Sequence, residues 1–111
     1  MQGLVLSVKK GPRDEKLTSR PITISVPAGT NRIVNFPAEF MALASGIQII
    51  NRDGANPITI TINNDVINSF TIPASGSVGL SDQWIEQIQV IAGAAGVTVI
   101  QSQVTPLNEV L

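Results

Sequence analysis

The chain has 111 residues, a length that suits one domain with one core. It contains no cysteine and no histidine, which excludes disulfides, catalytic sites of the Ser-His-Asp or Cys-His type, and zinc or copper sites built on those residues. Charged residues make up 14% of the chain and the net charge is −1, so there is no global basic field to hold nucleic acid.

The composition is rich in β-branched residues and poor in charge. Ile, Val and Thr account for 34 positions, and their side chains fit a pleated sheet better than a helix. An ordinary soluble domain is about 25% charged, so this chain has few charges to expose to water. We expect an all-β protein, part of whose outer surface is covered by copies of itself or by a partner. The alternative is that Asn, Gln, Ser and Thr solvate that surface.

In chain order, apolar and polar residues alternate over short segments that we expect to be strands. The first is residues 3–9, and residues 10–19 follow as an exposed charged loop. Residues 39–44 form either a short helical turn or an irregular crossing. The other expected strands are 21–26, 31–36, 46–51, 57–63, 66–72, 77–81, a segment from about 86 to 91, and 97–104, followed by a C-terminal tail at 105–111.

The spacing of these strands predicts the fold class. Parallel sheets need long crossovers, usually helical, and the sequence shows none. We therefore expect residues 1–111 to form a single antiparallel β-sandwich, jelly-roll-like, with about eight short strands. We expect Trp84 to be buried in the core or in an interface. The residues expected to contribute core are Ile22, Ile24, Ile58, Ile60, Ile62, Phe70, Ile72, Val97 and Val99.

A basic segment near the start of the chain is the candidate partner-binding site. Its members are Lys9, Lys10, Arg13, Lys16 and Arg20, which hold five of the seven positive charges. With only two acidic residues among them, the segment has a local charge of +3 on an otherwise acidic chain. Such a segment suits contact with an acidic neighbour, and the alternative is a solvated loop. It contains no aromatic residue, so it lacks the stacking platform of a nucleic-acid site.

The carboxylates offer little for catalysis. Most lie in expected turns, where Asp and Asn satisfy turn hydrogen bonds. Glu39 with Glu86 stays open as a carboxylate pair of the glycosidase type. We nevertheless expect no enzymatic activity and no catalytic residues, because the chain lacks a group that titrates near neutrality.

A calcium site is the remaining metal candidate. Asn51, Asp53 and Asn56, together with Asp65, carry the oxygen ligands that calcium prefers. They lie on loops at opposite ends of one expected strand, roughly 20 Å apart, so they cannot form one site within a chain. We interpret them as turn residues and expect neither a metal nor a cofactor.

Three segments carry a resemblance to a known group. Residues 52–63 read Arg-Asp-Gly-Ala-Asn-Pro-Ile-Thr-Ile-Thr-Ile-Asn and residues 70–77 read Phe-Thr-Ile-Pro-Ala-Ser-Gly-Ser, while Val-Pro-Ala-Gly-Thr-Asn-Arg at 26–32 is of the same kind. This pattern resembles small bacteriophage virion structural proteins, of the capsid decoration or minor capsid type. The resemblance covers about residues 20–104.

The resemblance implies a structural role. The chain would be a homo-oligomer, most often a trimer, in a virion assembled in the host cytoplasm. It would bind a major capsid protein or another virion protein, and neither nucleic acid nor a membrane. One alternative is a small carbohydrate-binding or adhesion β-sandwich, for example in a phage tail. Another is an oligomerising domain of a larger surface assembly. An exposed row of aromatic residues would favour the sugar-binding alternative.

Overall fold

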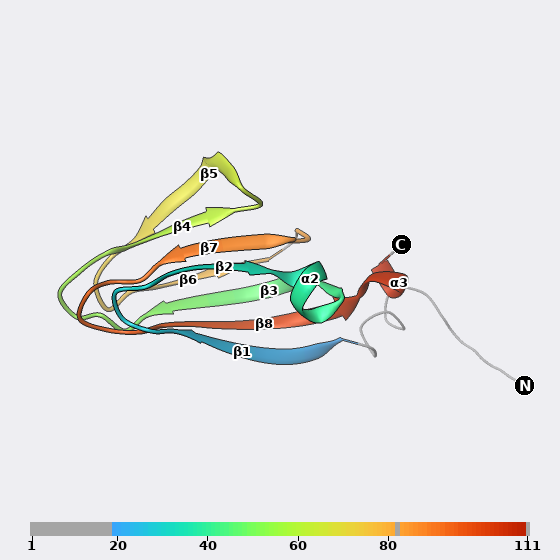
Figure 1. Cartoon of the computed structure of the whole chain (residues 1–111), viewed down its shortest axis with the longest axis horizontal. Coiled ribbons are helices and arrows are strands. Elements are labelled where there is room, and N and C mark those ends of the chain that lie inside the picture. Colours follow the sequence, from blue (N-terminus) through green and yellow to red (C-terminus); the bar gives the residue numbers. More distant parts are fainter. Residues whose placement is uncertain (1–18, 82, 111) are drawn as a thin grey trace, which may run out of the picture.

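The computed structural model describes residues 19–81 and 83–110, which form two antiparallel sheets of four strands each (Figure 1). The first sheet contains, in spatial order, β1 (Arg20–Val26), β8 (Thr98–Pro106), β3 (Ala42–Asn51) and β6 (Ser77–Leu80). The second contains β2 (Asn31–Asn35), β7 (Gln87–Ile91), β4 (Ile58–Ile62) and β5 (Asp65–Ile72). This two-sheet, eight-strand order is a jelly roll, which confirms the predicted fold class.

The core lies between the two sheets and consists mainly of aliphatic side chains. Successive residues along a strand point to opposite faces, so every second residue shares a face. The three isoleucines of β4 therefore all face inward. Burying one such side chain stabilises the fold by about 1.5–3 kcal/mol. The largest fully buried side chains are Val26, Val34, Phe36, Ile47, Ile49, Ile58, Ile60, Ile62, Ile72, Ile85, Ile88 and Ile100.

Most of the predicted core is confirmed, but the last strand has the opposite face inward. Ile22, Ile24 and Phe70 are only partly buried, at the rim of the core. Val97 is exposed and Val99 is half-buried, so their prediction as core residues was wrong. Four alternate residues of β8 are buried instead: Thr98, Ile100, Ser102 and Val104. The segment Val-Thr-Val-Ile is compatible with either face, and the pairing of β8 between two strands decides it.

On the approach to β7, Trp84 lies outside the core, so of its two expected places only an interface remains. Trp84 is 45% exposed, whereas Ile85 is fully buried. Ile85 forms an isolated bridge to Ala44, with its backbone N–H and C=O both bonded to that residue. This bridge turns the Ile85 side chain into the core and leaves Trp84 outside.

Two short helices lie beside the strands. α2 (Phe36–Phe40) follows β2 directly, and the side chain of Asn35 caps it by accepting a hydrogen bond from the Ala38 N–H at 3.0 Å. β3 therefore begins at Ala42, earlier than expected. In the expected tail, β8 continues to Pro106 and is followed by α3 (Leu107–Val110). Neither helix of the described chain is long and apolar enough to cross a membrane. The expected strand at 3–9 and nearly all of the loop at 10–19 lie outside the described residues.

The first prediction compares two isoleucines of the second sheet. Ile60 is fully buried and Ile33 is 53% exposed. We expect Ile60→Ala to lower the free energy of unfolding by about 2–5 kcal/mol, because it leaves a cavity between the sheets. The matched control Ile33→Ala should cost less than about 1 kcal/mol. Urea denaturation of both variants measures the difference, and equal losses would contradict the assigned core.

Candidate functional site

Four loops meet at the end of the sandwich shown on the left of Figure 1: β1–β2, β3–β4, β5–β6 and β7–β8. Backbone hydrogen bonds link them across the end. The Gly29 N–H donates to Gly93 O at 2.9 Å, and the Ser75 N–H donates to Asp53 O at 2.9 Å. These contacts join segments that are far apart in sequence into one continuous layer.

The carboxylate of Asp53 is the centre of this layer. Its Oδ1 accepts from the backbone N–H groups of Ala55 and Asn56, at 2.7 and 2.9 Å. Its Oδ2 accepts from the Asn56 side chain at 3.0 Å and from the Ala95 N–H at 2.9 Å. The residue is fully buried. Hydrogen bonds from the Asn56 side chain and from the N–H groups of Ala55 and Ala95 lower the pKa of Asp53 to about 2.

Two glycines of the β7–β8 loop allow the backbone to approach Asp53. A Cβ atom at Gly93 would collide with the Asp53 carboxylate. A Cβ atom at Gly96 would lie 2.6 Å from Asp53 Cα and 2.7 Å from the carbonyl oxygen of Arg52. The small residues at these positions therefore have a packing role, because larger ones would push the two loops apart.

Asn51 extends the same network. Its Nδ2 donates to the carbonyls of Asn56 and Pro73, both at 3.0 Å, and its Oδ1 accepts from the Asp53 N–H at 2.9 Å. Asp65 pairs with Ile62 at the other end of β4. The described part of the chain contains no group of three or more His, Cys, Asp or Glu residues placed to hold a metal. The side-chain oxygens of Asn51, Asp53 and Asp65 accept hydrogen bonds from nearby backbone N–H groups, as residues that order turns do.

Of the two carboxylates considered for catalysis, Glu39 has partners of its own and Glu86 is exposed. Glu39 Oε1 forms an ion pair with Arg32 Nη2 at 2.6 Å, and Glu39 Oε2 accepts from the Asn35 N–H at 3.1 Å. These contacts fasten α2 to β2. Glu86 is exposed, and its backbone carbonyl accepts from the Phe36 N–H. Neither carboxylate lines the hollow described below.

Only one member of the predicted basic site is described. Lys9, Lys10, Arg13 and Lys16 lie outside the described residues. Arg20 is exposed at the start of β1, where it pairs with Val104 of β8. The structure therefore leaves the predicted partner-binding segment untested.

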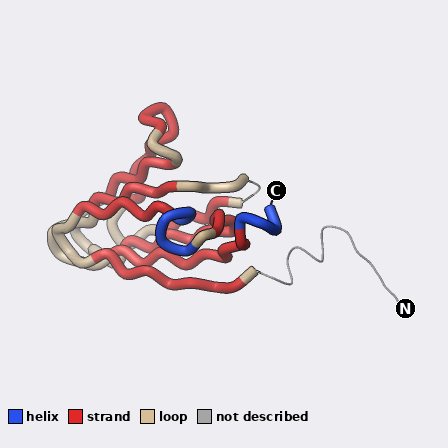
Figure 2. The backbone as a smooth tube through the Cα atoms, turned by 45° about the vertical axis from the view of Figure 1, so that its right-hand side comes forward, coloured by secondary structure: helices blue, strands red, loops and turns tan. Residues whose placement is uncertain are grey.

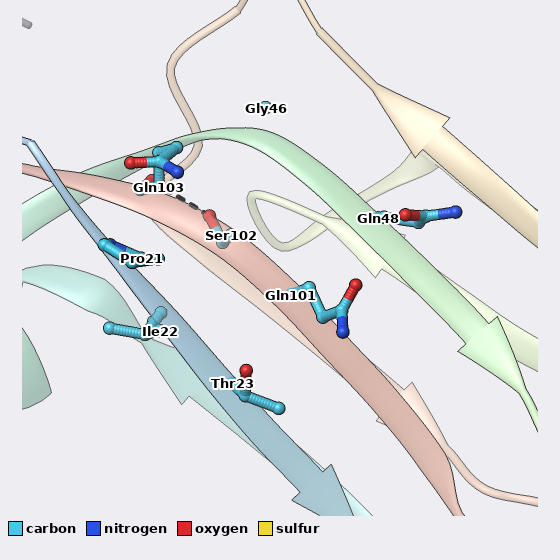
Figure 3. Close-up of a pocket in the computed structure, with 8 residues that line it drawn as sticks. All are labelled: Pro21, Ile22, Thr23, Gly46, Gln48, Gln101, Ser102 and Gln103. Carbon is cyan, nitrogen blue, oxygen red and sulfur yellow. Dashed lines mark hydrogen bonds between the residues drawn. The ribbon is translucent and has the colours of Figure 1, made fainter.

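A shallow hollow of about 330 Å³ lies on the first sheet, where β3 bulges away from β8 (Figure 3). The register of β3 against β8 shifts between Ser45 and Gln48, and Gly46 has a φ of 57° within this bulge. The hydroxyl of Ser102 lies 3.2 Å from the Ser45 carbonyl oxygen and stabilises the bulge. A glycine inside an apolar run was the sequence signal for this feature. The lining residues are Pro21, Ile22, Thr23, Gly46, Gln48, Gln101, Ser102 and Gln103.

The chemistry of the hollow is that of neutral amides and hydroxyls. Gln48, Gln101 and Gln103 can donate and accept hydrogen bonds, but they do not titrate. Among the residues that the structure describes, no carboxylate, cation or aromatic side chain lines the hollow. It suits contact with neutral polar groups and offers no group for proton transfer.

The outer faces of both sheets, as far as the structure describes them, carry no charged side chain. Strand alternation and register assign the outward residues. On the first sheet they are Pro21, Thr23, Ser25, Leu43, Ser45, Gln48, Ile50, Ser77, Gly79, Val99, Gln101, Gln103 and Thr105. On the second they are Asn31, Ile33, Asn35, Thr59, Thr61, Ser69, Thr71, Gln87, Gln89 and Ile91. The described charges lie at strand ends, in loops, in the two short helices and on the edge strand β2.

The second prediction concerns Asp53 and pH. Because its pKa falls from 3.8 to about 2 on folding, the ionised carboxylate stabilises the folded state above about pH 4. This contribution declines as the pH falls from about 4 towards 2. We expect Asp53→Asn to lower Tm at pH 7 by roughly 5–10 °C, and to show a smaller further drop between pH 4 and 2 than the wild type.

The matched control for this experiment is Glu86→Gln, which removes an exposed carboxylate. Its Tm should stay within about 2 °C of the wild type at pH 7. Differential scanning calorimetry across the pH series measures all three proteins. If Asp53→Asn melts like the control, Asp53 does not hold the loop layer together.

No protein-family model matches the chain, and no curated protein matches it. Among solved structures, it is similar to a chain of Bacillus endospore appendages, described as a novel family of disulfide-linked pili, with a TM-score of 0.55, 13% identity, and coverage of 79% of this chain and 87% of that one. The cupin domain of Schizosaccharomyces pombe Cnp3 matches with a TM-score of 0.48 and 13% identity, over 92% of this chain and 59% of that one. A de novo designed double-stranded β-helix matches with a TM-score of 0.43 and 10% identity, over 76% and 97%. At these identities the likeness concerns the fold alone.

Proposed function

We propose that the chain is a non-enzymatic structural subunit that associates with copies of itself in a virion, as a capsid decoration or minor capsid component on a capsid lattice. The observation that carries the proposal is the absence of charge from the outer faces of both described sheets. Charged side chains must lose hydration when a surface is covered, and like charges on identical copies repel. Faces without charge avoid both costs.

The outer face of the second sheet has two further features that favour burial. Some of its polar side chains are already bonded to one another: Thr61 to Ser69 at 2.9 Å, and Gln89 to Asn31 at 3.2 Å. Groups paired in this way lose less hydrogen bonding when water is removed. Ile91, on the central strand β7 of this face, is 47% exposed and would contribute apolar area to an interface.

The resemblance of residues 20–104 to small virion proteins supports the virion as the setting, and jelly rolls are common in viral capsids. The spore-appendage chain supports the wider idea that this fold serves as a repeated subunit, since those appendages are pili. Those pili are disulfide-linked, whereas this chain contains no cysteine. Its contacts with copies of itself would be non-covalent.

The sugar-binding alternative is supported less well. It calls for a row of exposed aromatic residues, and Trp84 is the exposed aromatic side chain among the described residues. Phe36 is buried, Phe40 and Phe70 are partly buried, and no aromatic lines the hollow. We therefore retain self-association as the proposed function.

The third prediction is the oligomeric state. We expect the purified chain to be a homo-oligomer in light scattering, with the trimer as the form that its resemblance implies. Because the outer faces are uncharged, the mass should persist in 1 M NaCl, where the Debye length is only about 3 Å. A monomer at several hundred micromolar, at either salt concentration, would contradict the proposal.

The fourth prediction concerns the capsid partner and the basic segment. Replacing Lys9, Lys10, Arg13 and Lys16 with Ser should weaken attachment to particles that lack this protein, and should reduce the salt dependence of attachment. Sedimentation of the variant with such particles measures both effects. Unaltered binding at every salt concentration would show that the segment is only solvated surface.

A further inference from the structure

The two sheets end in four edge strands, which differ in how well they are protected from pairing with another chain. β1 begins with a charge and a proline, Arg20 and Pro21. β6 has only four residues, and β2 has five and includes Arg32. β5 has eight residues, and after Asp65 it reads Val-Ile-Asn-Ser-Phe-Thr-Ile, without charge, proline or glycine. An uncharged, β-prone segment of this length is prone to pair with its own kind.

Two large aliphatic side chains in the first half of β5 are exposed to solvent. Val66 is 83% exposed and Ile67 is 90% exposed. The register against β4 passes from Thr61 opposite Ser69 to Ile62 opposite Asp65, so residues 66–68 bulge out without a β4 partner. Figure 2 shows this hairpin rising away from the rest of the sandwich.

The exposed bulge is built by specific contacts. The turn before it has positive φ at two successive residues, 54° at Asn63 and 55° at Asn64, as a tight hairpin turn requires. The Asp65 carboxylate then accepts a hydrogen bond from the Ile67 N–H at 3.0 Å. The chain thus fixes the backbone that displays Val66 and Ile67, which is unusual for a surface whose only role is solvation.

The second half of β5 has an incompletely covered apolar surface. Phe70 is partly buried against the core. One end of β5 therefore presents free apolar side chains, and the other end carries a phenylalanine that its own chain covers only in part.

We infer that β5 pairs antiparallel with β5 of a second copy, about a two-fold axis near Asn68 and Ser69. Antiparallel pairing sets the start of one strand beside the end of the other, so Val66 and Ile67 of each copy meet Phe70 of the other. The two Asp65 carboxylates come to lie at opposite ends of the pair and do not repel each other. The inference rests on the proposed function and assigns its self-association to one surface.

A second copy fits this surface better than a lipid membrane does. Within residues 19–81 and 83–110, the charges near the hairpin tip are Asp65 and Glu86, and Glu86 lies close because its N–H donates to Asn63 Oδ1 at 2.8 Å. Two carboxylates disfavour an anionic lipid surface. A two-fold contact joins subunits in pairs, so under this inference the oligomer is a dimer, or a larger oligomer with an even number of subunits, in place of the trimer that the resemblance implies.

The test compares the same substitution on opposite edges of the second sheet. Ile67→Lys places a charge in the inferred contact, and Ile33→Lys is the matched control, since Ile33 is an exposed isoleucine on the edge strand β2. Both side chains are exposed, so both variants should melt within about 3 °C of the wild type. We expect Ile67→Lys to halve the mass measured by light scattering and Ile33→Lys to leave it unchanged.

A cross-linking experiment tests the geometry directly. The chain has no cysteine, so a single introduced cysteine reports only on its own position. Ser69→Cys lies beside the inferred axis and should form a disulfide-linked dimer on mild oxidation. Thr71→Cys, on the same outer face, would lie on the order of 15 Å from its counterpart and should remain monomeric on a denaturing gel.

The outcomes separate this inference from the proposed function. A wild-type oligomer whose mass and cross-linking are insensitive to changes in β5 would overturn the β5 contact and leave self-association standing. A monomeric wild type would overturn both. If both lysine variants dissociate, the cysteine pair decides: cross-linking at position 69 and not at 71 supports the β5 contact, and any other pattern overturns it.

Discussion

The Asp53 carboxylate accepts hydrogen bonds from its own β3–β4 loop and from Ala95 of the β7–β8 loop, while its backbone carbonyl accepts one from Ser75 of the β5–β6 loop. A buried anion is tolerated only when donors surround it, and here they come from segments on different strands. Three of the four turns at this end are therefore positioned by one residue, and the β1–β2 loop joins them through the Gly29 N–H and Gly93 O. The spacing of the glycines that pack on Asp53 follows from the same requirement.

Charged residues and neutral polar residues occupy different parts of this sandwich. The described charges lie at the ends, in the loops and at the edge of the sandwich, where they cap α2 or order turns, while both outer faces consist of neutral residues. A small domain with few charges can remain folded in this way because its core and its loop layer hold it together, while exposed ion pairs such as Arg32–Glu39 contribute little. The neutral faces and the unprotected edge of β5 are then available for the contacts between copies that we propose.

Local patterning predicted the strands and the fold class, because alternation of β-branched and polar residues is a local signal. It failed on β8, where Val97 to Ile100 is compatible with either face, and it could not decide between the core and the surface for Trp84, where a bridge between Ala44 and Ile85 sets the orientation. The turn role of Asp53 was visible in the sequence. Its bond to Ala95, 42 residues later, was not, because such pairing depends on the whole topology. The bulge at Gly46 was signalled only by a glycine within an apolar run.

The position of β8 has a consequence for the order in which the chain folds. β8 is the last strand in sequence, yet it lies between β1 and β3 and pairs with both. During synthesis the first sheet therefore cannot close until the C-terminal residues have left the ribosome, and contacts of such long sequence separation form slowly. Until then β1 and β3 lack their shared neighbour, so chaperone occupancy should be greatest for chains that end before Thr98.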